Sequence, residues 1–233
     1  MIGIIGAMDE EVNAIKEYMK VLNENKVNDI IFYEGSIENK DVVLLLGGIG
    51  KVNAAVCSAL LFENYDIDYL INVGSSGGLD KFQNVGDIVI SDKVVHHDVD
   101  LVGFNYPYGQ LPQMPLFFES NKTLVKCVKD IIDEDNFNAR IGLIASGDQF
   151  VCTKGQVDTI LEHFPNALCA EMEAASIAQV AYKYKKPFII LRSLSDVFGK
   201  GDNNIQFDEY LKKASKESAN ITRKLIMKVD KLC

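Results

Sequence analysis

Short apolar runs alternate along this chain with longer segments in which apolar residues recur at helical spacing. The runs predict buried strands, because glycine, proline or polar residues bound them. They lie near residues 2–5, 30–37, 42–46, 69–73, 87–91, 139–145, 167–170 and 188–191. The spaced segments predict helices near residues 9–20, 52–63, 121–133, 154–161, 174–184 and 207–229. This alternation favours an α/β fold of three αβα layers with a central mixed sheet, and no repeat or linker divides residues 1–233, so we expect one domain.

Polar residues gather where the predicted strand at 188–191 ends. Arg192, Ser193, Ser195 and Asp196 follow its apolar run within five residues. In open α/β folds, ligands bind beyond the carboxyl ends of such strands, so these residues lie where active sites are usually found. An ion pair that caps the strand at the surface explains the pattern equally well.

Other predicted strands end in residues of the same kind. Glu11 follows the first strand, and Glu171 and Glu173 follow the run at 167–170. Gly74–Gly78 contains two serines and predicts a tight turn, either at a site or simply at the surface. Several carboxylates beside one arginine suggest a neutral, hydroxyl-rich substrate such as a ribose. Four apolar residues nearby suit a purine and an apolar substituent: Met8, Ile49, Phe150 and Phe207.

Two phosphate-binding motifs can be excluded at Gly47–Lys51, which links a predicted strand to a helix. A Walker A loop requires Gly at 45 and Ser or Thr at 52, where this chain has Leu45 and Val52. The dinucleotide fingerprint requires a small third residue, where this chain has Asn53. With both motifs excluded, we interpret the segment as a glycine turn that lets the backbone approach a ligand closely.

Neither a metal nor a cofactor is expected. His96 and His97 are neighbours on a predicted strand and therefore point to opposite faces, so they cannot easily bind one metal together. The five cysteines form no CxxC pair. The segment 103–115 is rich in aromatic residues and proline, which is typical of an apolar wall or a dimer contact.

Composition restricts the partners. The net charge of −9 disfavours a nucleic acid or a membrane surface, because both attract basic faces. No run approaches the roughly 20 apolar residues of a membrane span, and no signal peptide is recognisable at the N-terminus. The unpaired cysteines suit a reducing compartment. We therefore expect a soluble, cytoplasmic protein.

Eight motifs in order resemble those of the 5′-methylthioadenosine/S-adenosylhomocysteine nucleosidases, over essentially the whole chain. They occupy residues 3–12, 47–52, 72–79, 86–92, 108–112, 146–150, 171–174 and 192–197. The resemblance implies a nucleoside phosphorylase-like fold, a homodimer and irreversible hydrolysis of an N-glycosidic bond. It also implies thioether nucleosides as substrates, released as adenine and a thio-sugar in methionine salvage.

The resemblance also implies residue roles. Asp196 would protonate adenine at N7, and Glu11 would activate the attacking water. The other pocket residues implied are Met8, Ile49, Ser75, Gly77, Phe150, Val151, Met172, Glu173, Arg192, Ser195 and Phe207. Arg192 and Ser75 would assist Glu11, Glu173 and the Met172 backbone would hold the ribose hydroxyls, and Phe150 would stack on the purine. Three residues would reach in from the partner subunit: Leu101, Phe104 and Pro112.

Protonation by Asp196 at neutral pH requires a pKa above the usual value of about 3.9, which burial against apolar walls would provide. The chain departs from the family pattern at Phe198, where the family often has a small residue. The resemblance therefore does not determine the shape of the 5′ end of the pocket. Two alternatives remain: a phosphorylase of the same fold, which the acidic segment Gly6–Glu11 disfavours, and a nucleoside-binding protein without catalysis. The sequence also does not determine which nucleoside is preferred: methylthioadenosine, adenosylhomocysteine, 5′-deoxyadenosine or an aminofutalosine-type substrate.

Overall fold

Each predicted apolar run forms a strand of one sheet. The computed structural model describes residues 1–135, 137–201 and 203–229, apart from the side chains of 203–206, 208 and 209. The strands are β1 Ile2–Gly6, β2 Lys20–Val27, β3 Ile30–Ile37, β4 Lys40–Leu46, β5 Tyr69–Gly78, β6 Ile88–His96, β7 Phe118–Glu119, β8 Ala139–Ser146, β9 Ala167–Glu171 and β10 Phe188–Val197. The helices are α1 Asp9–Lys16, α2 Lys51–Asn64, α3 Lys122–Asp135, α4 Lys154–His163, α5 Ala174–Tyr184 and α6 Asn203–Lys228, with a 3₁₀ turn at Val102–Phe104.

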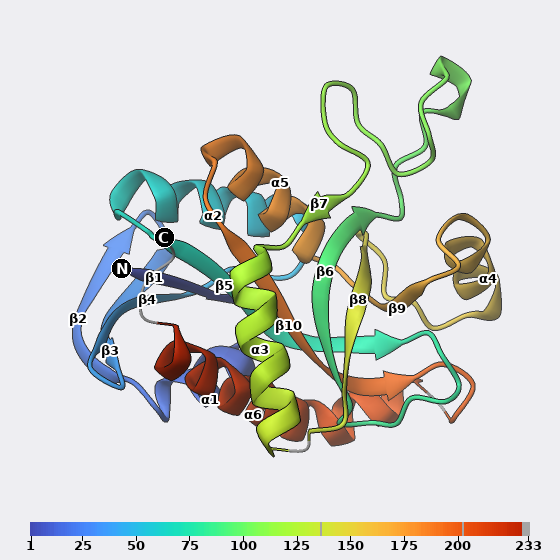
Figure 1. Cartoon of the computed structure of the whole chain (residues 1–233). Helices are drawn as coiled ribbons and strands as arrows, with labels where there is room; N and C mark the ends of the chain where they lie inside the picture. The colour runs from blue at the N-terminus through green and yellow to red at the C-terminus, as the bar shows by residue number, and fades with distance from the viewer. Residues whose placement is uncertain (136, 202, 230–233) are drawn as a thin grey trace.

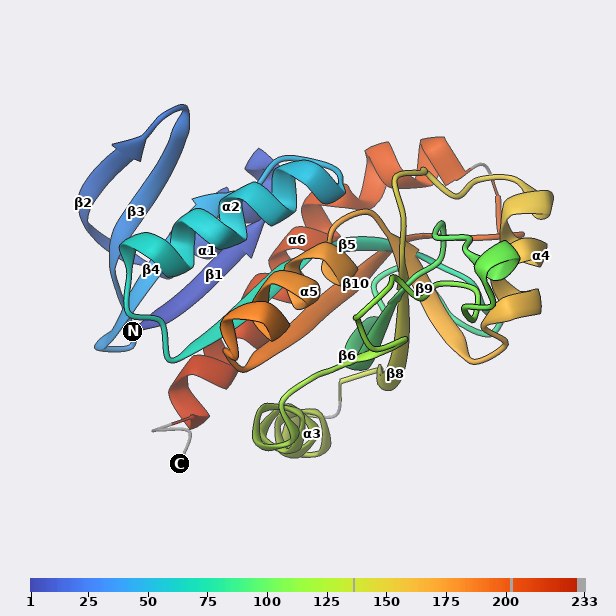
Figure 2. The same ribbon diagram turned by 90° about the horizontal axis from the view of Figure 1, so that it is seen from above.

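Helices cover both faces of the sheet, as expected for three layers (Figures 1 and 2). The alternation of side chains along β1 shows how the layers form: Ile2 and Ile4 face the core beneath α1, α3 and α6, whereas Ile5 faces the core beneath α2 and α5. A third core packs α4 against β6, β8 and β9. None of the described helices is both long enough and apolar enough to cross a membrane.

Part of the sheet closes on itself. Over the described residues, the sheet has ten strands in the order β10-β6-β8-β9-β5-β1-β4-β3-β2, and β7 pairs with β6. In addition, β10 pairs with β5 in parallel, and β5 pairs with β9 in antiparallel orientation through Gly77–Ala170 and Gly78–Cys169. The strands β5, β10, β6, β8 and β9 therefore form a ring, and β4, β3 and β2 extend from β1 as an open wing.

The structure differs from the sequence prediction at two strands. The predicted helix at 9–20 ends at Lys16, and β2 begins at Lys20. Strand β2 was missed because it is an exposed edge strand rich in Asn, Glu and Lys, which are typical residues for a protected sheet edge. The two-residue strand β7 was also missed, since it is too short to show a period.

The predicted turn at Gly74–Gly78 is wrong. Strand β5 continues to Gly78 and pairs with β10 as far as Val197. The polar residues at the ends of both strands are therefore part of the sheet, and Ser75, Ser76, Ser195 and Asp196 among them line a pocket. The glycines bring the backbone close to other groups: a Cβ at Gly74 would lie 2.7 Å from Oε1 of Glu11 and 2.8 Å from Nη1 of Arg192.

Candidate active site

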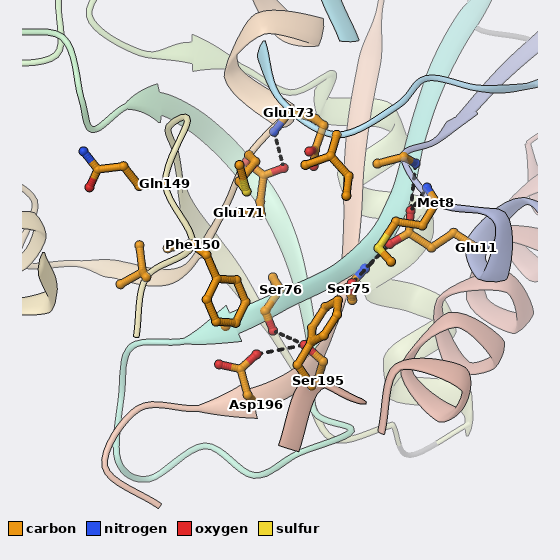
Figure 3. Close-up of a pocket in the computed structure, with 17 residues that line it drawn as sticks. Met8, Glu11, Ser75, Ser76, Gln149, Phe150, Glu171, Glu173, Ser195 and Asp196 are labelled. Atoms are coloured by element: carbon orange, nitrogen blue, oxygen red, sulfur yellow. Dashed lines mark hydrogen bonds between the residues drawn. The ribbon is translucent and has the colours of Figure 1, made fainter. Parts of the chain in front are cut away.

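A pocket of about 290 Å³ lies where β1, β5, β9 and β10 end (Figure 3). This is the carboxyl edge of the parallel strands, where ligands bind in α/β folds. The pocket is lined by Ala7, Met8, Glu11, Ile49, Ser75, Ser76, Gly77, Gln149, Phe150, Val151, Ala170, Glu171, Met172, Glu173, Ser195, Asp196 and Phe207. The segments that the sequence singled out therefore meet at one cavity.

Glu11 lies in the first turn of α1, with its carboxylate turned back towards the end of β1. Oε2 accepts hydrogen bonds from the amides of Ala7 and Met8, at 2.8 and 3.2 Å. Oε1 accepts bonds from the amide and the hydroxyl of Ser75, at 2.9 and 3.1 Å. Burial raises the pKa of Glu11, against the opposing effect of the Arg192 guanidinium and these donors. The side chain is held in one orientation, with its oxygens at the pocket wall.

A bulge in β10 places both Ser195 and Asp196 at the pocket. The pairing with β5 shifts register between Leu194 and Asp196, so Ser195 is an extra residue. Neighbouring residues of a regular strand point to opposite faces, and a bulge removes that restriction. Asp196 is 1% exposed, and its Oδ1 accepts a hydrogen bond of 2.9 Å from the Ser195 hydroxyl. Figure 3 shows Asp196 near Phe150, at the opposite end of the pocket from Glu11.

Glu173 precedes α5 and lies on the side of the pocket away from Asp196 (Figure 3). Its Oε1 accepts a hydrogen bond of 2.9 Å from the Gly50 amide, and its Oε2 lies 3.7 Å from Nη2 of Arg192. Burial and the neighbouring Glu171 carboxylate raise the pKa of Glu173 to about 8, although Arg192 opposes this. A carboxyl group of this kind suits contact with sugar hydroxyls, because it can accept or donate a hydrogen bond.

Arg192 does not line the pocket but lies behind its wall. Its Nη2 donates to Glu171 Oε2 at 2.5 Å and to Asn72 Oδ1 at 2.6 Å. Burial disfavours the charge of the guanidinium, but the carboxylates of Glu171, Glu173 and Glu11 raise its pKa. Arg192 therefore acts as the counter-charge for three buried carboxylates.

Two residues of this network were given no role by the resemblance, although the sequence singled out Glu171 as a polar residue at the end of a strand. Glu171 lines the pocket, and its Oε2 also accepts the amides of Glu173 and Ala174. Asn72 is fully buried in the middle of β5 and also donates to the carbonyl of Ile5 at 2.9 Å. An asparagine inside an apolar run was a signal in the sequence, since a buried amide requires partners.

Aromatic and apolar side chains form the remaining walls. Phe150 is 40% exposed, and its ring packs edge-on against Phe207, with 5.8 Å between centroids. Val151 is buried beside it, and Ile49 is half exposed on the loop before α2. Gln149, Ser76, Ala7 and Ala170 also line the pocket but were not predicted.

The predicted partner residues do not line the pocket of their own chain. Leu101, Phe104 and Pro112 lie in the segment between β6 and β7, which extends away from the sheet (Figure 1). Phe104 is 76% exposed. Phe198 likewise lies outside this pocket: it packs beside the third core and lines a separate groove with Leu79 and Ala167. Phe198 is therefore not part of the pocket wall.

Among the described residues, no three His, Cys, Asp or Glu side chains lie close enough to hold a metal ion. His96 bonds Gln179 through Nε2 at 3.0 Å. Burial lowers the pKa of both His96 and His97.

Known proteins match this chain almost from end to end. The Phosphorylase superfamily pattern matches residues 1–227. A 5′-methylthioadenosine/S-adenosylhomocysteine nucleosidase of Oceanobacillus iheyensis is 46% identical over 228 residues, which are 98% of this chain and 99% of that protein.

Solved structures agree with the sequence match. A nucleosidase of the same name from Streptococcus pneumoniae, solved with a transition-state inhibitor, is 39% identical with a TM-score of 0.93 and covers 98% of this chain and 99% of its own. One from Colwellia psychrerythraea, solved with adenine, is 38% identical with a TM-score of 0.94 and covers 99% of this chain and 96% of its own. The expected nucleoside phosphorylase-like fold is thus confirmed. The chain is a nucleosidase and belongs to the 5′-methylthioadenosine/S-adenosylhomocysteine nucleosidase family of the phosphorylase superfamily.

Proposed function

We propose that this nucleosidase hydrolyses the N-glycosidic bond of 5′-methylthioadenosine and S-adenosylhomocysteine, releasing adenine and the thio-sugar as a step of methionine salvage. 5′-Deoxyadenosine fits the same argument. The observation that carries the proposal is one pocket with two buried carboxyl groups at opposite ends, Asp196 beside Phe150 and Glu11 beside Ser75. The names of the relatives support the choice of substrates.

Asp196 is proposed as the general acid. With the purine against Phe150 and the Val151 backbone, adenine N7 faces Asp196, which donates its proton as the glycosidic bond breaks. Adenine is a poor leaving group until its ring is protonated, and general acid catalysis contributes roughly 10²–10⁴-fold. Asp196 lines the pocket and is 1% exposed, which supports this role.

Glu11 is proposed as the base. It accepts a proton from the water that attacks the anomeric carbon, and its charge stabilises the oxocarbenium-like ribose. The Ser75 hydroxyl, which donates to Oε1, can turn to the water instead. Over the whole reaction, Asp196 gives one proton to adenine and Glu11 gains one from water, so exchange with solvent restores both.

Glu173 and the Met172 backbone are proposed to bind the ribose hydroxyls between these groups. Met8, Ile49 and Phe207 supply apolar surface for the 5′-thio substituent. Arg192 acts from behind the wall, where it holds the nearby carboxylates rather than the substrate.

Water suits this pocket better than phosphate as the second reactant. A phosphate site requires several cationic donors, and no Lys or Arg lines the described pocket. Arg192 is already paired with Glu171, and the Glu11 carboxylate would repel a phosphate.

We also propose that the protein is a homodimer and that it is located in the cytoplasm. Leu101, Phe104 and Pro112 would close the 5′ end of the partner's pocket, which fits the exposure of Phe104 and the projection of its segment. Phe104→Ala should then raise KM for methylthioadenosine while leaving the pocket residues in place.

The deciding experiment measures adenine release from methylthioadenosine and adenosylhomocysteine in phosphate-free buffer. We expect turnover without phosphate and no sugar phosphate when phosphate is added. Turnover only in the presence of phosphate would identify a phosphorylase. Relative kcat/KM for the four candidate nucleosides then ranks the substrates.

A further inference from the structure

Three chain segments, two of which also line the pocket, meet in a closed ring of hydrogen bonds. Asp98, just after β6, accepts the Lys51 ammonium at Oδ1 and the Asp148 amide at Oδ2, at 2.6 and 2.9 Å. Asp148 in turn accepts the Lys51 amide at Oδ1, at 2.7 Å. The Lys51 and Asp98 side chains are 19% and 15% exposed, so solvent screens this ion pair only partly.

The ring adjoins both halves of the proposed substrate site. Asp148 is followed directly by Gln149, Phe150 and Val151, all of which line the pocket. We call residues 147–151 the purine loop. Lys51 follows Gly50, whose amide donates to Glu173. The Gly50 amide thus binds the Glu173 carboxylate on the ribose side, and the next amide, that of Lys51, binds the Asp148 carboxylate on the purine side.

The close approach of the segments shows that this arrangement is built into the chain. A Cβ at Gly147 would lie 2.6 Å from the His97 ring and 3.0 Å from Cγ of Asp98. At Gly50, where φ is +94°, a Cβ would lie 3.1 Å from Oδ1 of Asp148. Glycine at these two positions allows the purine loop and the start of α2 to approach the ring.

Asp98 is ionised in this setting. Burial alone would raise its pKa, but the bonds from Lys51 and the Asp148 amide bring the pKa below the ordinary value. Hydrogen bonds to a charged acceptor are roughly twice as strong as neutral ones. Asp98 therefore holds the start of the purine loop by a strong contact with the Asp148 amide.

We propose that Asp98 is a positioning residue of this nucleosidase, which fixes the purine loop to Lys51 and thereby aligns the adenine and ribose subsites. This proposal rests on the proposed function, since it concerns the same pocket. Asp98 does not line that pocket. Its loss should weaken binding of the purine while the acid and the base keep their places.

The test compares Asp98→Asn with a matched control, Asp80→Asn. Asp80 also accepts one backbone amide and one cationic side chain, from Phe82 at 2.9 Å and Arg140 at 2.8 Å, but lies outside the pocket. Calorimetric titration with adenine and steady-state kinetics with methylthioadenosine are run on both variants. Asp98→Asn should raise the Kd of adenine and KM about tenfold with kcat within about threefold, and Asp80→Asn should change neither.

Lys51 variants separate positioning from folding. Lys51→Met should reproduce the loss of adenine affinity, Lys51→Arg should retain affinity, and the double variant Asp98→Asn/Lys51→Met should be no worse than either single change. Lys51→Met also decides the matter if Asp98→Asn does not fold. Unchanged adenine affinity in Lys51→Met or Asp98→Asn, beside an active wild type, would overturn the positioning role alone. A wild-type protein that releases no adenine would overturn the proposed function and this proposal with it.

Discussion

Arg192 and Glu171 form an almost completely buried ion pair at the pocket wall, with 2.5 Å between Nη2 and Oε2 and side-chain exposures of 1% and 3%. The guanidinium also faces Glu173 and Glu11. One cation thus sets the electrostatic conditions for three carboxylates at the site.

Arg192→Met should destabilise the protein, because it leaves buried carboxylates without a counter-charge. Removing one partner of a buried pair costs about 3–5 kcal/mol, and each kcal/mol shifts Tm by about 2–4 °C at this size. The double variant Arg192→Met/Glu171→Gln should regain part of that loss, which differential scanning calorimetry can measure. Equal Tm values for the single and double variants would contradict a direct coupling.

Asp196→Asn should abolish turnover but keep adenine binding. An asparagine has nearly the same shape but no acidic proton, so we expect kcat to fall by about 10²–10⁴-fold. Adenine release and adenine Kd are measured in parallel, with the exposed Asp92→Asn as control. A kcat within tenfold of wild type would remove Asp196 from the role of general acid.

Glu11→Gln should also lower kcat by about 10²-fold or more, because a neutral amide can neither accept the water proton nor stabilise the ribose cation. Glu10→Gln changes the neighbouring carboxylate, which does not line the pocket. Single-turnover kinetics on both variants tests the difference. Comparable rates for the two variants would argue against Glu11 as the base.

Glu173→Gln should make the protein more stable at alkaline pH. The folded-state pKa of about 8 lies above the ordinary value of 4.5, so the contribution of Glu173 is fully present below about pH 4.5 and is lost as pH rises through 8. Relative to wild type, the variant should gain at least about 2–4 °C in Tm at pH 9, and the difference should vanish near pH 4.5. Exposed Glu24→Gln serves as control. A difference in Tm between Glu173→Gln and wild type that stays constant from pH 4.5 to 9 would contradict a raised pKa of Glu173.

Gly74→Ala should disrupt the site, since its Cβ would meet Glu11 and Arg192 at less than 3 Å. We expect at least tenfold lower kcat/KM, because a small displacement of catalytic groups is costly. Gly155→Ala is the matched control: no atom lies within 4 Å of its Cβ, and the change should stabilise α4 by about 0.4–1 kcal/mol. Full activity of Gly74→Ala would contradict this prediction and show that Glu11 and Arg192 can move away from residue 74 without loss of function.

The sequence predicted the buried strands and most of the pocket residues because apolar runs and motif residues are local signals. The edge strand β2 gave no such signal, since its residues are mostly exposed and its partner β3 supplies the hydrogen bonds. The extension of β5 through Gly78 was hidden for a related reason: glycines and serines resemble a turn unless the facing strand is known.

Features that depend on packing could not be predicted. The bulge at Ser195 depends on the register between β10 and β5, which lie far apart in the chain. The position of Arg192 behind the wall depends on Asn72 and Glu171, which come from two other strands. The motif indicated that these residues belong to the site but not which of them faces the substrate.

The ring of strands has a consequence for the working cycle of the enzyme. Strand β10, which carries Asp196, is hydrogen-bonded to β5 as far as Val197 on one side and to β6 at Leu191–Ser193 on the other, and both ladders resist its separation from the sheet. The purine loop and the loop before α2 lie outside these ladders. We therefore expect the nucleoside to enter and adenine to leave by movement of these loops, while β10 keeps Asp196 in place.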